Sequence, residues 1–156
     1  MNAPINLSNT IAFNLNGNKV EAFEGETIIQ TAKRNGVEIP HLCYMEGMRP
    51  DGNCRSCMGE IRGERVLAPS CCRAPKPDME VISNNERALA SQKMVLELLL
   101  ADMPKHDYKP DNELTYWAKK LKVSNPRFEP RMSPDADLSN AAIAVNLDAC
   151  IQCTRC

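Results

Sequence analysis

Apolar and polar residues alternate between residues 10 and 26, in the stretch TIAFNLNGNKVEAFEGE. A period of two is typical of strands that bury one face. Asn16-Gly17 lies between the two runs, and this dipeptide favours a type I′ turn, in which both central residues have positive φ. The sequence therefore predicts a β-hairpin whose buried face carries Ile11, Phe13, Leu15, Val20 and Ala22.

The pattern changes to a helical period directly after the hairpin, in TIIQTAKRNG. Thr27 and Gln30 have the spacing of a capping box, and Gly36 stands where a glycine in the left-handed conformation ends a helix. This predicts a short helix with an apolar stripe formed by Ile28, Ile29 and Ala32.

Three short strand-like runs follow a cysteine-rich loop, at residues 58–61, 65–68 and 79–82, with Gly63 in a turn between the first two. A hairpin, a helix and further short strands predict a small mixed sheet crossed by one helix. The expected fold class is therefore α+β.

The next segments are predicted to be helical and then extended. Ser83 and Glu86 suggest a second capping box for a helix that runs to about Asp102 and ends before Pro104. Its expected core positions are Leu89, Met94, Val95, Leu98 and Leu99. A shorter helix, ELTYWAKKL, places Leu114, Trp117 and Leu121 on one face. Three prolines within residues 126–134 then predict an extended linker over residues 124–140.

Charge and hydropathy narrow the possible partners. With 19 Lys and Arg against 20 Asp and Glu, the chain has no overall basic field, so nucleic acid is not an expected partner. The longest apolar stretch, MVLELLLA, is too short to span a bilayer. The N-terminus lacks the features of a secretory signal, so we expect a cytoplasmic protein without a membrane partner.

Five of the eight cysteines lie between residues 40 and 72. In the cytosol thiols are kept reduced, so such a cluster favours metal or redox chemistry over structural disulfides. Cys54-x2-Cys57 can grip one metal from a tight turn, and the single cysteines Cys43 and Cys71 flank this pair. Sulfur ligands select zinc, copper(I) or iron–sulfur clusters.

The spacing favours a [2Fe–2S] cluster, with zinc as the main alternative. Structural zinc sites commonly use two close cysteine pairs, whereas this loop has one. Its glycines allow backbone N–H groups to approach sulfur, as an anionic cluster requires. Structural disulfides are a further alternative. So is a thioredoxin-like redox role of Cys54 and Cys57, in which Arg55 would lower the pKa of a thiol, although that motif belongs at a helix N-terminus.

The hairpin, the capped helix and the cysteine spacing together resemble the β-grasp [2Fe–2S] ferredoxin domain. This domain occurs in the 75-kDa-type subunit of complex I, in diaphorase subunits of NAD-reducing hydrogenases and in iron-only hydrogenases. The segments IPHLC, RPDGNCRSCM, GERVLAPSC and AVNLDACIQCTRC further resemble the N-terminal part of the alpha subunit of NAD-dependent molybdenum or tungsten formate dehydrogenases. The resemblance covers residues 10–156.

This resemblance implies specific roles for residues of the cysteine loop. It implies that the ligands of the [2Fe–2S] cluster are Cys43, Cys54, Cys57 and Cys71. Backbone N–H donors to sulfur are then expected from Gly52, Asn53, Arg55 and Ser56. The Ala-Pro-Ser that precedes Cys71 matches the family ligand, so Cys72 is expected to be a free thiol beside the site.

The chain departs from its wider relatives after the long helix. Complex I and hydrogenase relatives usually carry a His-x3-Cys-x2-Cys-x5-Cys site there, but this sequence has no cysteine between Cys72 and Cys150. That additional cluster is therefore predicted to be absent, and His106 is expected to be a surface residue.

The second cysteine group, Cys150, Cys153 and Cys156, matches the first three ligands of a bacterial C-x2-C-x2-C-x3-C-P run. In the resembling proteins these thiols bind a [4Fe–4S] cluster with a fourth cysteine that this sequence does not contain. We therefore expect a fragment of a longer subunit, or a chain that stops within the motif.

The expected organisation has four parts: a β-grasp ferredoxin domain (residues 1–84), a helical connector (85–123), an extended linker (124–145) and the start of a bacterial-type [4Fe–4S] ferredoxin domain (146–156). The expected function is one-electron relay between a flavin- and NADH-binding diaphorase-type subunit and the pterin-metal catalytic part of a formate dehydrogenase-type complex. No residue is expected to make or break a substrate bond. The alternatives are a zinc-bound structural module and a stand-alone ferredoxin.

Overall fold

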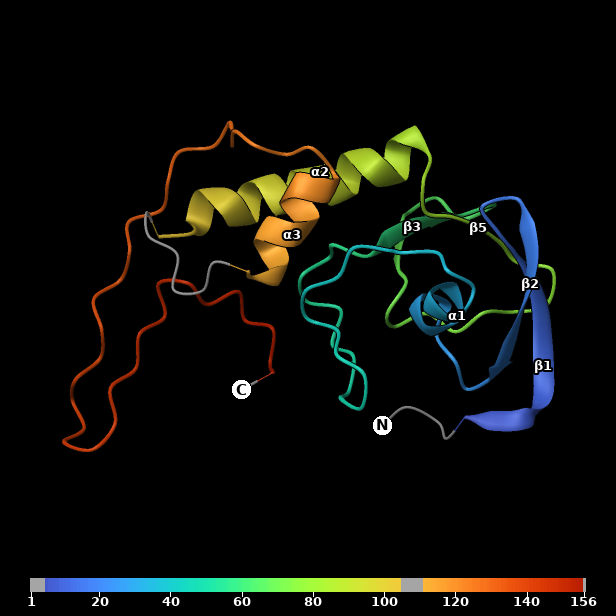
Figure 1. The fold of residues 1–156 in the computed structure, drawn as a ribbon, viewed down its shortest axis with the longest axis horizontal. Helices are drawn as coiled ribbons and strands as arrows, with labels where there is room; N and C mark the ends of the chain where they lie inside the picture. Colours follow the sequence, from blue (N-terminus) through green and yellow to red (C-terminus); the bar gives the residue numbers. More distant parts are fainter. Residues whose placement is uncertain (1–4, 105–110, 156) are drawn as a thin grey trace.

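The computed structural model describes residues 5–104 and 111–155 and shows a five-stranded sheet, three helices and a long C-terminal segment (Figure 1). His106, predicted to be a surface residue, and Cys156, predicted to bind a cluster, lie outside the described residues. In chain order the elements are β1 (Asn6–Leu15), β2 (Asn18–Glu24), α1 (Ile28–Arg34), β3 (Met58–Ile61), β4 (Ala68–Pro69), β5 (Glu80–Ile82), α2 (Glu86–Asp102) and α3 (Glu113–Lys120).

The N-terminal hairpin is confirmed. Strands β1 and β2 pair antiparallel, with Phe13 opposite Val20 and Leu15 opposite Asn18. Asn16 and Gly17 have φ values of 53° and 85°, as a type I′ turn requires. The alternation of the sequence therefore sets both the register of the hairpin and the face that it buries.

The sheet has the strand order β2-β1-β5-β3-β4 and is mixed, because β1 and β5 are parallel while the other pairs are antiparallel. The expected α+β fold class is thus confirmed. Helix α1 contributes to the core under the sheet, which includes Phe13, Leu15, Ile28, Ile29, Ala32, Ile61 and Val81. The strand predicted at residues 65–68 is wrong in its bounds: the turn at Gly63 continues as a longer loop, and only Ala68 and Pro69 pair with β3.

Both ends of α1 follow the sequence prediction. The expected capping box is present, and in it the Thr27 N–H donates to Oε1 of Gln30 at 2.8 Å. Gly36 has a φ of 72°, as a glycine just beyond a helix end does. The chain therefore leaves α1 in a fixed direction and enters the cysteine loop.

Helix α2 ends where predicted, but its start and its buried face differ from the prediction. The N-cap is Asn85, whose side chain accepts the N–H of Ala88 at 2.9 Å. The Ser83 side chain is not the cap, because its hydroxyl is hydrogen-bonded to Asn16 instead. The fully buried positions include Ala88, Gln92 and Leu96, whereas the predicted core residues Met94 and Leu98 are 39% and 44% exposed.

The buried face of α2 is anchored by a polar residue. The Gln92 side-chain amide donates to the carbonyl groups of Met58 in β3 and Ser83 at 2.8 and 3.0 Å. A buried amide needs such partners, so Gln92 rather than a large apolar residue fixes the rotation of the helix. The predicted positions Leu89, Val95 and Leu99 are half-buried, so the apolar stripe gave the buried face only in part.

Helix α3 packs as predicted, with Leu114 and Trp117 buried. Together with Leu42, Cys43, Cys54 and Leu96 these residues form a second apolar cluster, separate from the core under the sheet. Leu121 packs against the same cluster. Thus α3 and α2 support the cysteine loop from the side that faces away from the sheet.

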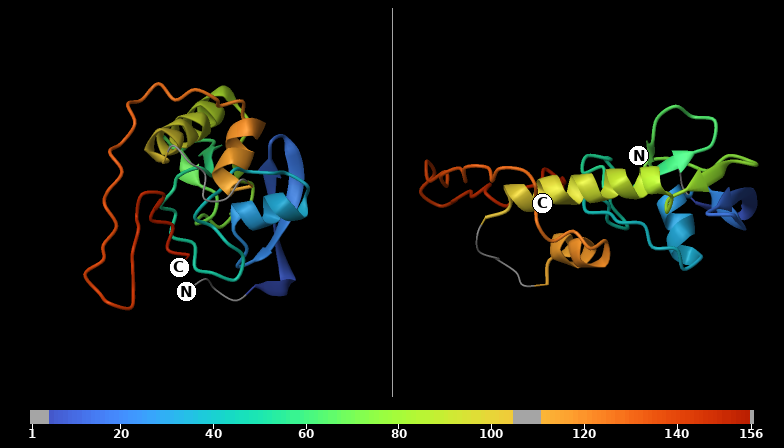
Figure 2. Two further views of the ribbon diagram at one scale, coloured as in Figure 1. Left: turned by 60° about the vertical axis from the view of Figure 1, so that its left-hand side comes forward. Right: turned by 90° about the horizontal axis from the view of Figure 1, so that it is seen from above.

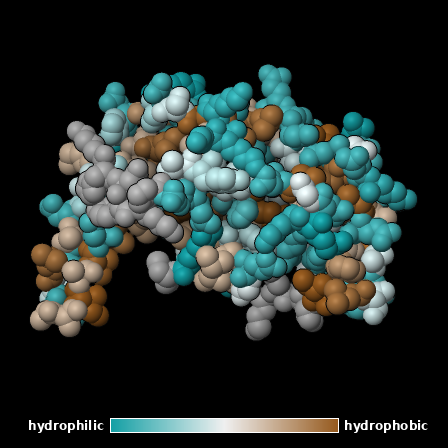
Figure 3. Space-filling view, viewed as in Figure 1, coloured by the Kyte–Doolittle hydropathy of each residue, from teal (hydrophilic) through white to brown (hydrophobic). Residues whose placement is uncertain are grey.

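After α3, residues 124–155 form a long C-terminal excursion that leaves the helices and returns toward the cysteine loop (Figures 1 and 2). Its only β-pairing among the described residues is an isolated antiparallel bridge between Asp137 and Val145. The excursion carries exposed apolar side chains, seen as the brown arm in Figure 3, which include Met132, Leu138, Ile143 and Leu147. No helix within the described parts of the chain is long and apolar enough to cross a bilayer.

Arg127, near the start of the excursion, is hydrogen-bonded and ion-paired to Glu97 of α2. The buried carboxylate of Glu97 accepts the backbone N–H of Arg127 at 2.7 Å, and the Arg127 guanidinium donates to both carboxylate oxygens at 2.7 and 2.8 Å. These bonds, with the Arg127 side chain as the largest cause, lower the pKa of Glu97 from 4.5 to about 2.

The bond between Glu97 and Arg127 predicts a pH-dependent contribution to stability. Because the folded-state pKa of Glu97 is depressed, its contribution is complete above pH 4.5 and is lost as the pH falls toward 2. We expect Arg127→Gln to lower the melting temperature at neutral pH, with a deficit that shrinks below pH 4.5. Lys122→Gln on the same surface is the control. A deficit that does not vary with pH would contradict this account.

Candidate iron–sulfur site

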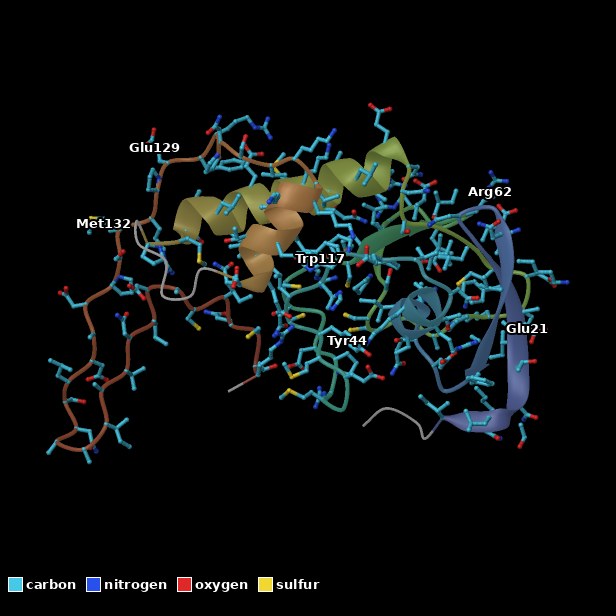
Figure 4. All side chains as sticks on the ribbon, in the orientation of Figure 1. Glu21, Tyr44, Arg62, Trp117, Glu129 and Met132 are labelled. Atoms are coloured by element: carbon cyan, nitrogen blue, oxygen red, sulfur yellow. The ribbon has the colours of Figure 1, made fainter. Side chains whose placement is uncertain are left out.

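The four cysteines of the candidate site come from three places in the fold. Cys43 and Cys54 lie on the loop between α1 and β3, Cys57 immediately precedes β3, and Cys71 follows β4. Cys43, Cys57 and Cys71 are at most 4% exposed, and Cys54 is 9% exposed. Tyr44 of this loop and Trp117 of α3 are labelled in Figure 4.

The β3–β4 pairing brings Cys57 and Cys71 together. Met58 pairs with Pro69, and one step further the Ser70 N–H donates to the Cys57 carbonyl at 3.0 Å. Hydrogen bonding between the two thiols is the largest cause that raises the pKa of Cys71 and lowers the pKa of Cys57. The two thiols thus form a buried pair next to the β3–β4 pairing.

Cys43 and Cys54 form a second pair. The Cys43 N–H donates to Sγ of Cys54 at 3.4 Å. Burial is the main cause that raises the pKa of Cys43 from 9.0 to about 11, while the backbone N–H groups of Cys54 and Asn53 act in the opposite direction. Both N–H groups therefore favour the thiolate form of Cys43.

The site therefore consists of two pairs of thiols rather than one converging set. Within residues 5–104 and 111–155, no three His, Cys, Asp or Glu side chains are gathered closely enough to hold a single metal ion. Pairs of sulfurs suit a dinuclear cluster, in which each iron takes two protein ligands.

The residues predicted as backbone donors take different positions. Among them, Asn53 has its N–H near the Cys43 sulfur. Arg55 has a φ of 58°, which turns the chain between Cys54 and Cys57. Ser56 is fully buried. The roles of Gly52, Asn53, Arg55 and Ser56 as donors to cluster sulfur remain predictions.

Gly52 packs directly against Cys72. It has a φ of 66°, and a Cβ atom at this position would stand 2.9 Å from Sγ of Cys72. The Cys72 side chain is exposed, and its sulfur lies 3.5 Å from Sγ of Cys71 and 3.7 Å from the Pro50 carbonyl oxygen. The loop and the segment after β4 are thus in close contact at the edge of the site.

This contact predicts that Gly52→Ala destabilises the protein through both strain and a clash. A left-handed alanine costs about 1–2 kcal/mol by itself, and the clash adds to that. Gly47→Ala is the matched control, because Gly47 has a φ of 84° but nothing within 4 Å of its Cβ position. Urea denaturation should show a larger loss for Gly52→Ala, partly recovered by adding Cys72→Ala. Equal losses for the two glycine variants would contradict the predicted clash.

Two buried hydroxyls beside the cysteines have no partner among the described residues. Ser56 and Ser70 are 0% and 1% exposed, and Oγ of each lacks a hydrogen bond. Each serine directly precedes a buried cysteine, Cys57 or Cys71. A buried hydroxyl without a partner costs free energy, so its presence points to a partner that the protein chain does not supply. The residues of the site therefore fit a cluster with acceptor sulfurs.

The second cysteine group lies against the first loop. Asn53 Nδ2 donates to the Gln152 carbonyl at 3.3 Å, and Arg155 donates to the Tyr44 carbonyl at 2.7 Å. Cys153 packs on the apolar cluster that contains Cys43 and Cys54, whereas Cys150 is exposed. The two cysteine motifs are therefore neighbours, although about 100 residues separate Asn53 from Gln152 in the sequence.

Comparison with known proteins decides the family. The profile described as "2Fe-2S iron-sulfur cluster binding domain" matches residues 8–86, which include all four cysteines of the two pairs. The chain belongs to this family. The match of this [2Fe–2S] domain ends at the first residue of α2, so it spans the sheet, α1 and the cysteine loop.

Relatives of this [2Fe–2S] domain protein are subunits of larger oxidoreductases. The NADP-reducing hydrogenase subunit HndD of Solidesulfovibrio fructosivorans is 34% identical over 94% of this chain and 27% of its own length. A subunit of the NADH-quinone oxidoreductase of Rhizobium meliloti is 34% identical over 88% of this chain and 17% of its own length. The chain thus spans about a quarter or less of these relatives.

A solved structure shares the fold. A chain in the crystal structure of an NAD+-reducing [NiFe]-hydrogenase in the H2-reduced state superimposes with a TM-score of 0.81 at 26% identity. The superposition covers 94% of this chain and 64% of that chain. It therefore includes the helices and most of the C-terminal excursion as well as the [2Fe–2S] domain.

The sequence prediction missed two parts of the site. Ser70 was not among the predicted residues, although the dipeptide Ser-Cys occurs twice, at residues 56–57 and 70–71. The sequence also gave no sign of a cavity of about 290 Å³ between α1, the loop and α3, lined in part by His41, Tyr44 and Trp117. His41 is held there between the rings of Tyr44 and Trp117, at centroid distances of 5.6 and 5.7 Å.

Proposed function

We propose that this protein is an electron-transfer module whose [2Fe–2S] cluster is held by Cys43, Cys54, Cys57 and Cys71. The observation that carries the proposal is the burial of these four thiols within the matched domain, where the β3–β4 pairing sets Cys57 opposite Ser70, next to Cys71, and the Cys43 N–H donates to Sγ of Cys54. When bound, such a cluster exchanges one electron at a time. The chain's own residues hold it, keep it dry and offer backbone N–H groups to its sulfurs.

The exposed and buried thiols support different roles for the adjacent cysteines. Cys71 is fully buried and lies next to the residue that pairs with Cys57, whereas Cys72 is exposed. We therefore assign Cys71 as the ligand and Cys72 as a neighbour of the cluster.

We further propose that Cys150, Cys153 and Cys156 bind a [4Fe–4S] cluster in a longer parent protein, together with a fourth cysteine outside this sequence. The support is the C-x2-C-x2-C spacing and the contact of residues 152–155 with the first cysteine loop. In that parent, electrons would pass between two neighbouring clusters. The four-part division of the chain at residues 84, 123 and 145 is part of the same proposal.

The parent is proposed to be a cytoplasmic, NAD-dependent formate dehydrogenase with a flavin- and NADH-binding diaphorase-type subunit and a pterin-metal catalytic part. The support is the resemblance of the segments around the cysteines, since the relatives found by comparison are hydrogenase and NADH-quinone oxidoreductase subunits. The module itself would exchange electrons and carry no substrate chemistry.

Anaerobic reduction of the full-length parent tests this assignment. Formate should reduce the [2Fe–2S] cluster within the turnover time of the complex, and NADH should do so through the diaphorase-type subunit. Both are followed by EPR of frozen samples, with a Cys57→Ser parent as the control without an intact cluster. Reduction by hydrogen or NADH but not by formate would overturn the formate dehydrogenase assignment and leave the electron-transfer role standing.

A further inference from the structure

The strongest unexplained feature of the molecule is a pair of buried hydroxyl groups next to Cys57 and Cys71 for which the described residues offer no hydrogen-bond partner. Ser56 and Ser70 have buried hydroxyls without a partner among the described residues, and the exposed Cys72 has its sulfur 3.5 Å from the sulfur of Cys71. All three residues are next to a proposed ligand in the sequence.

Ser70 lies on the same face of the β3–β4 pair as Cys57. Its N–H donates to the Cys57 carbonyl at 3.0 Å, which places Ser70 directly opposite Cys57. Its Oγ is 3.4 Å from the position that a Cβ on Gly59 would take, and Gly59 follows Cys57 by two residues. Because alternate residues of a strand share a face, the hydroxyl stands on the side that carries the Cys57 sulfur.

Cys72 has a defined position relative to the same iron ligand. If Cys71 binds iron as a thiolate, the Cys72 thiol is the only one of the two that carries a proton. That proton can be donated to Sγ of Cys71 at 3.5 Å or to the Pro50 carbonyl at 3.7 Å. The missing side chain of Gly52 leaves the space in which this sulfur sits.

We propose that Ser56, Ser70 and Cys72 donate side-chain hydrogen bonds to the sulfurs on the Cys57–Cys71 side of the cluster and so raise its reduction potential. The inference rests on the proposed [2Fe–2S] function. Reduction adds negative charge to the cluster, and hydrogen bonds to its sulfurs stabilise that charge. In the cluster-bound protein, sulfurs on this side of the cluster accept hydrogen bonds from the two hydroxyls, for which the described residues offer no acceptor.

The first test uses the protein without its cluster. Removing an unsatisfied buried hydroxyl should leave stability unchanged or increased, because no hydrogen bond is lost. We therefore expect Ser56→Ala and Ser70→Ala apoprotein to melt at or above the wild-type temperature. Ser83→Ala is the matched control, since Ser83 is also buried but is bonded to Asn16, and it should melt lower. Apoprotein melting clearly below wild type for both Ser56→Ala and Ser70→Ala would overturn the proposal.

The second test measures the midpoint potential of the reconstituted cluster by anaerobic EPR titration. The triple variant Ser56→Ala, Ser70→Ala, Cys72→Ala should reduce roughly tenfold less favourably than wild type, which corresponds to about 59 mV for one electron. Cys72→Ser keeps a hydrogen-bond donor, so its midpoint potential should stay near that of the wild type. The midpoint potential of Cys72→Ala should be lower. Ser83→Ala should leave the potential unchanged.

The outcomes separate this inference from the proposed function. A wild-type protein that binds no iron and sulfide would remove the proposed function itself. A wild-type cluster whose potential is unchanged in the triple variant, or changed equally by Ser83→Ala, would overturn the hydrogen-bond inference alone. Variants that bind the cluster but shift its potential downward would support it.

Discussion

Cys71→Ser is expected to lose or perturb the [2Fe–2S] cluster, whereas Cys72→Ser is expected to keep it. Cys71 is fully buried and paired with Cys57, so its sulfur has no substitute on the inner side of the site. Cys72 lies outside this pair and is exposed. The measurement is iron and acid-labile sulfide per chain, with the visible absorption and EPR spectra of anaerobically purified protein.

The two adjacent cysteines serve as each other's control, because the change of side chain is the same and the positions differ by one residue. We expect the Cys72→Ser protein to match the wild-type iron content and Cys71→Ser to fall well below it or to show an altered EPR signal. An intact cluster in Cys71→Ser together with a lost cluster in Cys72→Ser would reverse the ligand assignment.

Trp117→Ala should give the largest loss of stability among the substitutions outside the cysteines. Trp117 is 6% exposed and belongs to the cluster that includes Cys43 and Cys54, so its removal leaves a cavity next to the site. Truncation of a buried tryptophan costs about 3–5 kcal/mol in the free energy of unfolding. Urea denaturation measures this loss, and faster bleaching of the cluster in air should accompany it.

The neighbouring Tyr116 provides the control for this experiment. It lies on the same helix but is 52% exposed, so Tyr116→Ala should cost less than about 1 kcal/mol. Similar losses for the two variants would mean that α3 contributes little to the support of the cysteine loop, which would contradict the burial of Trp117 against that loop.

The elements that the sequence predicts correctly are those whose structure depends on residues within the element itself. The β1–β2 hairpin and α1 depend on a turn dipeptide, a capping box and a glycine that lie within each element, and all were predicted. The buried face of α2 was predicted only in part, because Gln92 is oriented by carbonyl groups of Met58 and Ser83. A polar residue whose partners are distant in sequence looks like a surface residue in a hydrophobic pattern.

The candidate site was predictable to a similar extent. Cysteine spacing indicated the set of four thiols but grouped Cys54 with Cys57, whereas the structure places Cys54 beside Cys43, and Cys57 next to Cys71 across the β3–β4 pairing. Spacing could not indicate the unsatisfied hydroxyls of Ser56 and Ser70, because burial depends on the whole fold. The contact between Asn53 and Gln152 likewise depends on the path of the C-terminal excursion, which no local pattern encodes.

The most direct test of the central claim is metal and sulfide analysis of anaerobically prepared protein, combined with EPR before and after dithionite. Two irons and two sulfides bound by the first cysteine group, and a one-electron signal that appears on reduction, are the predicted result. Mutation of Cys57 should remove the signal, while mutation of Cys150 should leave it. Zinc without iron in the same preparation would contradict the electron-transfer account.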